Sequence, residues 1–555
     1  MIFKKLGEWR KPAIALAALS GMLVFSACQT KESSDPITDF FLLQALTNPA
    51  TSSTGCAAIS DPFYSNQWHL NNTGQFGGTS GEDAKVTSVW SSETCGNNIT
   101  ISVIDDGMEI AHEDLAPAVI AGMSHNYITG SSDPTSVSAN HGTSVGGVAA
   151  ARANTIGVRG AAPQASLVGY NLLQSFTNAN QADAMTRNAA SVHVSNNSWG
   201  PTDGTGKFDA SPSLWQSAIE TGLSTGRGGL GTVYLWAGGN GSTNFVAIDN
   251  SNYDGYANYH GVVAICAIGD KGKQAAYSEP GANLWVCAHS QGDTTSSTGT
   301  AISTTDNSGG FGYNTGGSTT NLNNSNYTNT FNGTSSAAPL AAGVVALMLQ
   351  ANPNLTWRDV KLILAESARK NDSTDSDWAV NSGVKAGGGA GGYNINHKYG
   401  FGAVDANAAV TLARTWTNVG TQVIHAPGVV TDGNAIPDNN TTGVTDTTSI
   451  TGSGITRIEH VDITINTDHS YVGDLEVTLT SPAGTSSTLS VTHVCRVAGS
   501  LTQQLCGTFT GNTWRFGSSR YLGEGANGTW TITIKDQAGG DTGTFTSWQL
   551  KFYGR

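Results

Sequence analysis

From Ile99 onward the chain alternates short apolar runs with stretches of helical periodicity. The apolar runs have the length and composition of buried strands and occupy residues 99–104, 162–173, 192–198, 232–236 and 261–268. Helical stretches lie between or after them, at 181–190, 213–222 and 340–350. Strands that alternate with helices form a parallel sheet covered on both faces. The pattern therefore predicts an α/β domain, to which we assign residues 56–414.

Two local features refine this domain. Thr356 followed by Asp359 is typical of a helix start, because a Thr side chain at that place accepts a hydrogen bond from the first turn. Residues 289–330 are rich in Ser, Thr, Asn and Gly, and this composition predicts a long loop.

After about Thr415 apolar and polar residues alternate one by one. Four runs share this period of two: Val461, Ile463 and Ile465; Leu475, Val477 and Leu479; Trp530, Ile532 and Ile534; Trp548, Leu550 and Phe552. Such runs, separated by Gly, Asn and Asp turns, predict a β-sandwich. We assign residues 415–555 to this second domain and expect a jelly-roll-like arrangement.

The N-terminus has the pattern of an exported protein. Basic residues precede an apolar run, Ile14 to Phe25, which is too short to span a bilayer and predicts a signal peptide over residues 1–27. The end of the run resembles the cleavage site of bacterial lipoproteins, which implies a lipid on Cys28 and a membrane anchor. The alternative is an ordinary signal and a secreted protein. Residues 28–55 are predicted to be a tether.

The net charge and the number of cysteines limit the classes of ligand and the disulfide pairings that the protein can have. The net charge of −14 argues against nucleic-acid binding and fits either cationic ligands or solubility alone. Seven cysteines are an odd number for an exported protein, and a lipid on Cys28 would leave six to pair. Six cysteines allow fifteen connectivities. Among them we favour neighbours in sequence: Cys56 with Cys95, Cys266 with Cys287, and Cys495 with Cys506.

Three segments carry the candidate chemistry. Asp105 ends a strand-like run, His141 precedes a row of small residues, and Ser335 lies at a predicted helix start. A Ser hydroxyl becomes a good nucleophile only when a base removes its proton, and a carboxylate orients that base. The order Asp, His, Ser is the subtilisin order. Each residue alone has an ordinary structural interpretation, but together and in this order they predict a serine peptidase.

Two further polar residues, Asn240 and Ser144, are candidates for a catalytic role. Asn240 follows the strand-like run 232–236, and a side-chain amide at that place donates to the oxyanion of the tetrahedral intermediate. The alternative is a simple Asn-Gly turn. Ser144 lies in a G-x-S-x-G pattern, but the residues before it are polar rather than strand-like, so we exclude it as a nucleophile.

These segments resemble the kexin and furin branch of the subtilisin family. The resemblance rests on Asp105-Asp106-Gly107, Ser198-Trp199-Gly200-Pro201 and Asp254-Gly255-Tyr256, and residues 469–475 and 481–485 are similar to the P domain of such enzymes. It implies cleavage of proteins after Arg or Lys. The substrate-binding residues it implies are Asp106, Asp203, Asp254, Ser198, Gly200 and Asp209. Gln174 stands where convertases carry an acid, so we expect a weaker demand for paired basic residues.

The resemblance also implies calcium. One site would use Asp61, Asp114 and the chain near Asn154, and a second would use Asp203, Asp249 and Glu279. The alternative is ordinary solvated carboxylates. Residues 28–60 are too few for the inhibitory propeptide that family members carry. We therefore expect unaided folding or a separate chaperone, and a monomer.

Two other functions compete with a basic-specific protease. One is a non-enzymatic surface adhesin that binds through the β-sandwich. The other is a scavenging protease without basic preference. The complete set of catalytic residue types argues against the adhesin, and a cleavage profile separates the two proteases.

Overall fold

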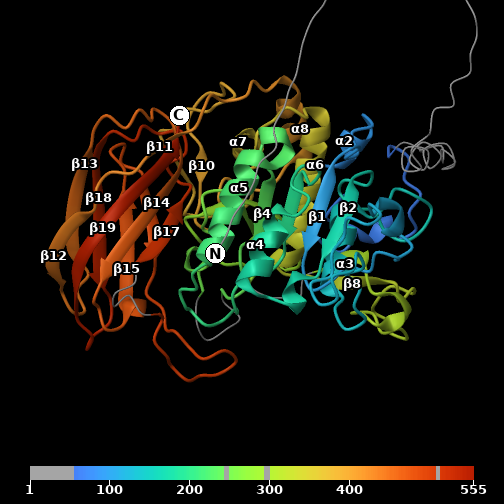
Figure 1. Ribbon diagram of the computed structural model, residues 1–555, viewed down its shortest axis with the longest axis horizontal. Helices are drawn as coiled ribbons and strands as arrows, with labels where there is room; N and C mark the ends of the chain where they lie inside the picture. The colour runs from blue at the N-terminus through green and yellow to red at the C-terminus, as the bar shows by residue number, and fades with distance from the viewer. Residues whose placement is uncertain (1–55, 243–248, 293–299, 508–512) are drawn as a thin grey trace, which may run out of the picture. The chain divides into compact units, whose positions relative to one another are not determined.

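A computed structural model describes residues 56–242, 249–292, 300–507 and 513–555 of the chain (Figure 1). The predicted signal peptide, the tether and Cys28 lie outside the described residues.

A parallel sheet forms the centre of the N-terminal domain. Among the described residues it has six strands in the order β2-β1-β3-β4-β5-β6 (Figure 1). The strands are β1 (Thr100–Ile104), β2 (Ser166–Tyr170), β3 (Val194–Asn197), β4 (Val233–Ala237), β5 (Val262–Ile268) and β6 (Leu284–His289). Five of them were predicted from their apolar runs, and the predicted α/β class is confirmed. The sixth, β6, was missed although all its residues are buried.

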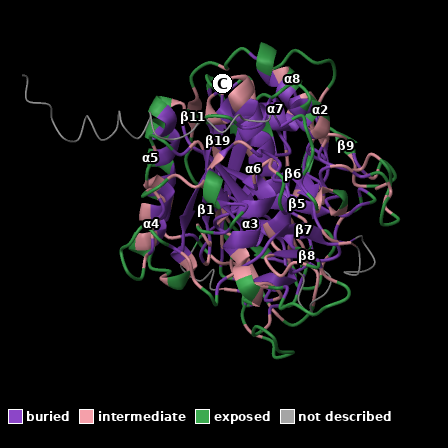
Figure 2. Ribbon diagram, turned by 90° about the vertical axis from the view of Figure 1, so that its right-hand side faces the viewer, coloured by how far each residue is buried: buried purple, intermediate pink, exposed green. Residues whose placement is uncertain are grey.

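Helices cover both faces of this sheet. Successive strand residues point to opposite faces, so Val103 packs with α3 and α6 whereas Ile104 packs with α4 and α5. The four helices are α3 (His141–Ala150), α6 (Thr334–Ala351), α4 (Asn178–Thr186) and α5 (Ser213–Gly229). Helix α6 is long and apolar enough to cross a membrane, but 83% of it is buried inside the domain. Figure 2 shows it among the buried elements, as a core helix.

Shorter elements complete the domain. They are α2 (Thr87–Trp90), α7 (Trp357–Ser367), α8 (Ala406–Thr415), the strand pair β9 (Ala379–Val380) and β10 (Asn394–Ile395), and the 3-10 turns at Tyr64–Asn66, Ala116–Ala118, Leu172–Gln174, Ser251–Tyr253 and Ser308–Gly310. The predicted start of α7 is confirmed, because Thr356 and Asp359 form a reciprocal capping box.

The prediction of one long loop over 289–330 was wrong in part. Ile302–Thr305 (β7) and Tyr327–Phe331 (β8) pair as antiparallel strands. The hydroxyls of Thr304 and Thr305 donate to backbone oxygens of α3, at 2.8 and 2.7 Å. Because these hydrogen bonds satisfy the polar side chains, a Thr-rich segment is buried here where composition indicated a loop.

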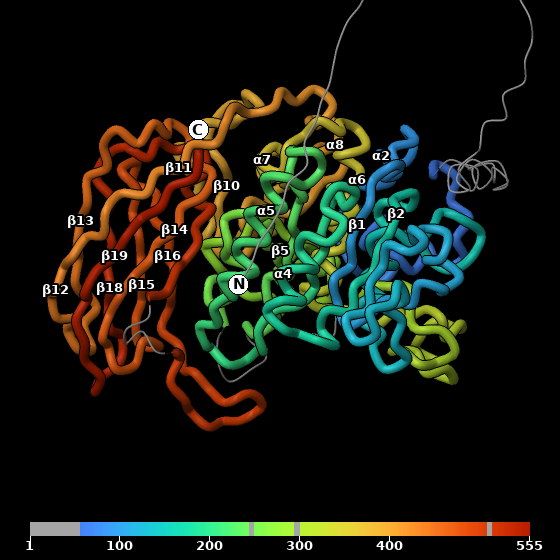
Figure 3. The backbone as a smooth tube through the Cα atoms, in the orientation of Figure 1, coloured from blue at the N-terminus to red at the C-terminus, as the bar shows by residue number. Residues whose placement is uncertain are grey.

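The C-terminal domain consists of two antiparallel sheets, as predicted (Figure 3). One holds β11 (Val423–His425), β12 (Val430–Ile436), β14 (Ile458–Thr467), β17 (Trp514–Ser518) and β19 (Gly543–Gly554). The other holds β13 (Val444–Ile450), β15 (Leu475–Thr480), β16 (Ser486–Ser490) and β18 (Gly528–Asp536). All twelve residues of the four alternating runs are buried in one core. The boundary near residue 415 stays a prediction.

Three disulfides link segments of the chain, and hydrogen bonds connect its two domains. The three disulfides are Cys56–Cys95, Cys266–Cys287 and Cys495–Cys506, which are the favoured pairs. Between the domains, Arg358 makes two hydrogen bonds of 2.6 Å to Glu459, and both side chains are 9% exposed. The Tyr253 hydroxyl lies 2.9 Å from the Ser490 hydroxyl.

Replacing Arg358 with Ala is expected to lower the free energy of unfolding by about 2 kcal/mol, because the buried Glu459 carboxylate loses two charge-assisted hydrogen bonds and keeps only its pair with Arg555. Chemical denaturation measures this change. The matched control is Arg187→Ala, which breaks a more exposed pair, with Asp183 one helical turn away, and should cost about 1 kcal/mol or less. Equal losses for both variants would contradict a stabilising domain interface.

Candidate active site

Asp105 and His141 form a directly bonded pair. Asp105 follows the last residue of β1, and His141 is the first residue of α3. The Nδ1 atom of His141 lies 2.8 Å from Oδ1 of Asp105. Burial disfavours the imidazolium, but the Asp105 carboxylate outweighs burial and raises the pKa of His141 above its ordinary value.

The neighbouring acid, Asp106, caps the helix that carries His141. Its two carboxylate oxygens accept hydrogen bonds from the N–H groups of His141 and Gly142, at 3.2 and 2.9 Å. Burial, and then the charge of Asp105, raise the pKa of Asp106 to about 7. Asp106 therefore positions the imidazole, and its carboxylate is only partly ionised near neutral pH.

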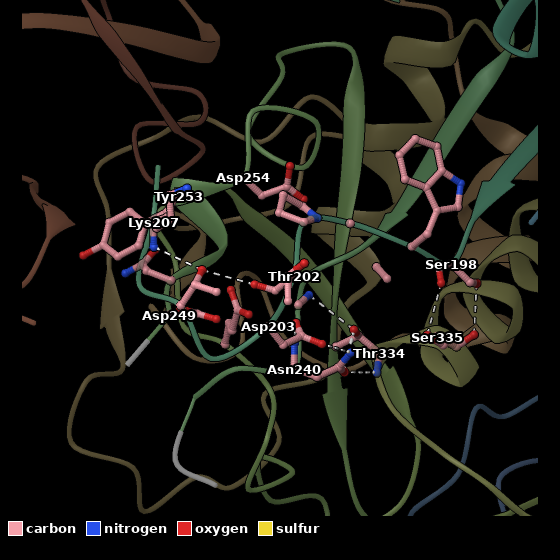
Figure 4. A pocket seen from close by; sticks show the side chains of 18 residues that line it. Ser198, Thr202, Asp203, Lys207, Asn240, Asp249, Tyr253, Asp254, Thr334 and Ser335 are labelled. Carbon is pink, nitrogen blue, oxygen red and sulfur yellow. Dashed lines mark hydrogen bonds between the residues drawn. The ribbon is translucent and has the colours of Figure 1, made fainter. Parts of the chain in front are cut away.

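Ser335 lies in the first turn of α6, where backbone N–H groups have no partner within the helix. Its hydroxyl donates to the carbonyl oxygen of Ser198 at 3.2 Å, and the Ser198 hydroxyl donates to the carbonyl oxygen of Ser335 at 3.0 Å (Figure 4). In the described residues the Ser335 hydroxyl makes no hydrogen bond to His141, although both side chains line the same cavity. Catalytic hydrogen bonds are often formed only once substrate binds.

Asn240 lies beside Ser335 and is held on two sides. Its Oδ1 accepts from the N–H and hydroxyl of Thr334, at 2.7 and 2.9 Å, and its backbone N–H donates to Asp203 at 2.9 Å (Figure 4). This fixes the amide group, whose NH₂ donates one hydrogen to Oδ2 of Asp203 at 3.4 Å and has a second for an oxygen near Ser335. Thr334, which directly precedes Ser335 in the chain, was not predicted as a site residue.

A cavity of about 210 Å³ opens beside Ser335. Asp203 and Asp254 both line it, together with Ser198 and Gly200. A Cβ atom on Gly200 would lie 3.1 Å from Oδ2 of Asp254, so glycine leaves this carboxylate open to a ligand. Burial raises the pKa of Asp254 to about 7, and an adjacent cation would favour its ionised form. Lys207, Asp249 and Glu279 also line the cavity, so four carboxylates outnumber one lysine and the cavity suits a cationic side chain.

Of the predicted substrate-binding acids, Asp106 and Asp209 do not line this cavity. Asp209 pairs through its backbone with the segment at Asp254, because its N–H donates to Tyr253 and its carbonyl accepts from Gly255. Gln174 is exposed at the end of a 3-10 turn.

Three of the carboxylates that line the cavity lie close together. Oxygens of Asp203, Asp249 and Glu279 lie within 4.8 Å of one another. Burial, and then the charges of Asp249 and Asp203, raise the pKa of Glu279 well above its ordinary value. Across the described ranges, no Lys, Arg or His forms an ion pair with any of the three. Gly239, at φ +101°, permits this approach, since a Cβ there would lie 2.3 Å from Glu279. Clustered oxygens without a partner cation suit Ca²⁺.

The residues of the other predicted calcium site have protein partners. Asp61 forms a fully buried ion pair of 2.8 Å with Arg159 and accepts from the N–H of Asn154. Asp114 accepts from the Asn154 amide and from the N–H of Val158, at 2.8 and 2.9 Å. The structure brings the three residues together, but Arg159 already neutralises one of the two acids.

Comparisons with known proteins agree with this architecture. Residues 96–402 match the Subtilase family, and residues 458–552 match the Proprotein convertase P-domain. Neuroendocrine convertase 2 of Drosophila melanogaster is 33% identical over 89% of this chain and 72% of its own length. Human furin is 32% identical over 89% of this chain and 58% of its own length. A solved serine protease of Aeromonas sobria is 27% identical, with a TM-score of 0.78 over 91% of this chain and 97% of its own.

The fold and these matches define a subtilisin-like serine endopeptidase with a P domain behind its catalytic domain. The chain belongs to the subtilase family, in its kexin and furin branch.

The replacement Asp105→Asn is expected to lower the pKa of His141 below its wild-type value, because the carboxylate that raises it is removed while burial remains. NMR titration of ¹³C-labelled histidines measures this. His125, whose pKa is lowered by burial and then by Arg187, serves as the internal control and should not change. An unchanged His141 titration would mean that the pair does not govern this imidazole.

Proposed function

We propose that the protein is an exported endopeptidase that cleaves after single Arg or Lys residues through an acyl-enzyme on Ser335. The observation that carries this proposal is the carboxylate-lined cavity that opens directly beside Ser335 and Asn240. A cationic side chain in that cavity would meet Asp254 and Asp203 in charge-assisted contacts.

The mechanism follows from the chemistry of the assembled groups. His141 takes the proton from the Ser335 hydroxyl as the oxygen attacks the substrate carbonyl, and Asp105 stabilises the imidazolium. The Asn240 amide and the Ser335 N–H hold the oxyanion. His141 then donates its proton to the leaving amine, and water releases the acyl group. Because only neutral imidazole acts as base, the rate falls as the pH drops through the raised pKa of His141.

A second basic residue in the substrate is expected to matter less. Asp106 remains our candidate for its contact, but each of its oxygens already accepts a backbone N–H, from His141 and Gly142, which reduces its capacity for a ligand. With Gln174 in place of an acid, the second position offers little net charge. We assign Asp209 to a more distant basic side chain.

We infer that Ca²⁺ is held by Asp203, Asp249 and Glu279. The ion would neutralise three converging carboxylates in the wall of the specificity cavity, and it would fix Asp203, which also accepts from Asn240. A second ion at Asp61, Asp114 and Asn154 would have to share Asp61 with the Arg159 guanidinium and would therefore bind less tightly.

Export and anchoring rest on the cysteines. The three disulfides favour an oxidising compartment, and they pair six of the seven cysteines. Cys28 remains for the proposed lipid. The Aeromonas sobria serine protease has also been solved with a chaperone, at 28% identity and a TM-score of 0.77. That complex supports our proposal of a separate folding chaperone. The monomeric state stays a prediction.

Peptides that differ only in Arg or Phe before the cleaved bond test the specificity. We expect the Arg peptide to be preferred, and Asp254→Asn to lower its kcat/KM roughly 10- to 100-fold, because a charge-assisted contact is lost. The Phe peptide should be little affected by the same replacement. A wild-type preference for Phe would overturn the assignment of the cavity and favour a scavenging protease.

Two serine variants provide the control for the nucleophile. Ser335→Ala should abolish labelling by a fluorophosphonate and the hydrolysis of both peptides. Ser144→Ala should retain both, because the Ser144 hydroxyl is buried and donates to the carbonyl of Thr305 at 2.8 Å. Activity that persists in Ser335→Ala would favour a different nucleophile, and no labelling in the wild type would favour the adhesin.

Removing calcium is expected to lower the melting temperature, because an ion that binds only the native state stabilises it by about 2.7 kcal/mol at 100-fold excess over Kd. Calorimetry with Ca²⁺ and with a chelator measures the difference. It should shrink in Glu279→Gln and persist in Glu476→Gln, which changes a surface acid of the P domain paired with Lys535. A difference that is unaffected by Glu279→Gln would place the ion elsewhere.

A further inference from the structure

A second cavity, of about 310 Å³, meets the catalytic groups from another side. His141, Ser335 and Asn240 line it, as they would the reacting carbonyl, but Asp203 and Asp254 do not. Aromatic rings of Tyr277, Phe331 and Tyr313 form much of its remaining wall. The character of this cavity therefore differs from that of the acidic one.

The aromatic wall is a continuous row that begins at the imidazole. The ring centres of His141 and Phe331 lie 5.3 Å apart in an edge-to-face arrangement, and those of Phe331 and Tyr313 lie 5.9 Å apart. Phe331 is 2% exposed, whereas Tyr313 is 42% exposed. Tyr313 thus ends the row with an open ring surface, which another apolar group can cover.

Tyr313 is presented by a firmly held segment. The next residue, Asn314, is buried, and its backbone N–H donates to Asp306 at 2.6 Å. The Asn314 side chain donates to carbonyl oxygens of Leu322 and Tyr327, at 2.9 and 2.8 Å. Because these bonds fix the backbone at Tyr313, little conformational entropy is lost when a ligand meets the ring.

The chemistry of peptide cleavage decides which part of a substrate enters this cavity. In the proposed function, the residue before the cleaved bond occupies the acidic cavity. The present inference rests on that proposed function. The leaving amine must receive its proton from His141, so the segment after the cleaved bond lies on the imidazole side. The second cavity therefore receives the residue after the cleaved bond, and we propose that Tyr313 makes it select an aromatic or large apolar side chain.

Acyl transfer isolates this step. In the acyl-enzyme, an added amine attacks the ester carbonyl in place of water. Its proton passes to His141, the ester C–O bond breaks, and the proton returns to the Ser335 oxygen, so that an amide and free enzyme result. An amino-acid amide used as the amine occupies the site of the leaving residue. The ratio of transfer to hydrolysis therefore reports on the second cavity alone.

The experiment uses the full chain, a peptidyl-arginine ester, and either phenylalanine amide or glycine amide as acceptor. Wild type should prefer phenylalanine amide, and Tyr313→Ala should lower that preference about three- to tenfold. Hydrolysis of the peptidyl-arginine ester without an acceptor gives the reference rate for each variant. The matched control is Phe311→Ala, since Phe311 is 64% exposed on the same segment and does not line the cavity.

A second variant distinguishes a change in acceptor selectivity from local unfolding around residue 313. Tyr313→Glu should shift the preference from phenylalanine amide to arginine amide, which loss of folding could not produce. Equal acceptor ratios in wild type, Tyr313→Ala and Tyr313→Glu would overturn the proposal. If the arginine ester fails to acylate the enzyme, the basic specificity is wrong, and a peptidyl-phenylalanine ester then tests the second cavity independently.

Discussion

The parallel direction of the central strands is the constraint on which the site depends. The carboxyl ends of parallel strands meet at one edge of a sheet. Asp105 follows β1, Ser198 follows β3 and Asn240 follows β4, so three distant segments reach the same edge. Helix α6 packs across this sheet and brings Ser335 to it. Reversing one strand would move its side chain to the opposite edge, so topology rather than sequence proximity assembles the chemistry.

That same edge concentrates negative charge, and the chain balances it with backbone N–H groups. Asp106 accepts from the start of α3, and Asp249 accepts from Gly204 and Gly206. The P domain holds the segment that supplies these donors, because Arg496 N–H donates to the carbonyl of Thr205 at 2.8 Å. The P domain thus contributes to the specificity cavity as well as to stability. The negative charge of these carboxylates that the N–H groups do not offset would attract a cation.

Sequence reasoning reached the sheet because buried parallel strands are apolar throughout, as in residues 262–268. The sequence also indicated the candidate triad, because the types of the three residues, their order in the chain and their local contexts agree. It could not find that Asp106 caps α3, since a capping carboxylate from a distant strand leaves no local pattern. It also could not find the partnership of Asp61 with Arg159, which joins residues 98 positions apart. Such contacts depend on tertiary packing.

The misjudged segment 289–330 shows why composition fails most readily near a catalytic site. Its Thr and Asn residues resemble those of a solvated loop, yet Thr304, Thr305 and Asn314 are buried because each finds backbone partners. A polar segment fixed in this way can approach charged groups closely and still hold one apolar ring, that of Tyr313, at a set position. A purely apolar segment would have been drawn into the core. The polar composition is therefore what keeps this wall of the second cavity at the surface.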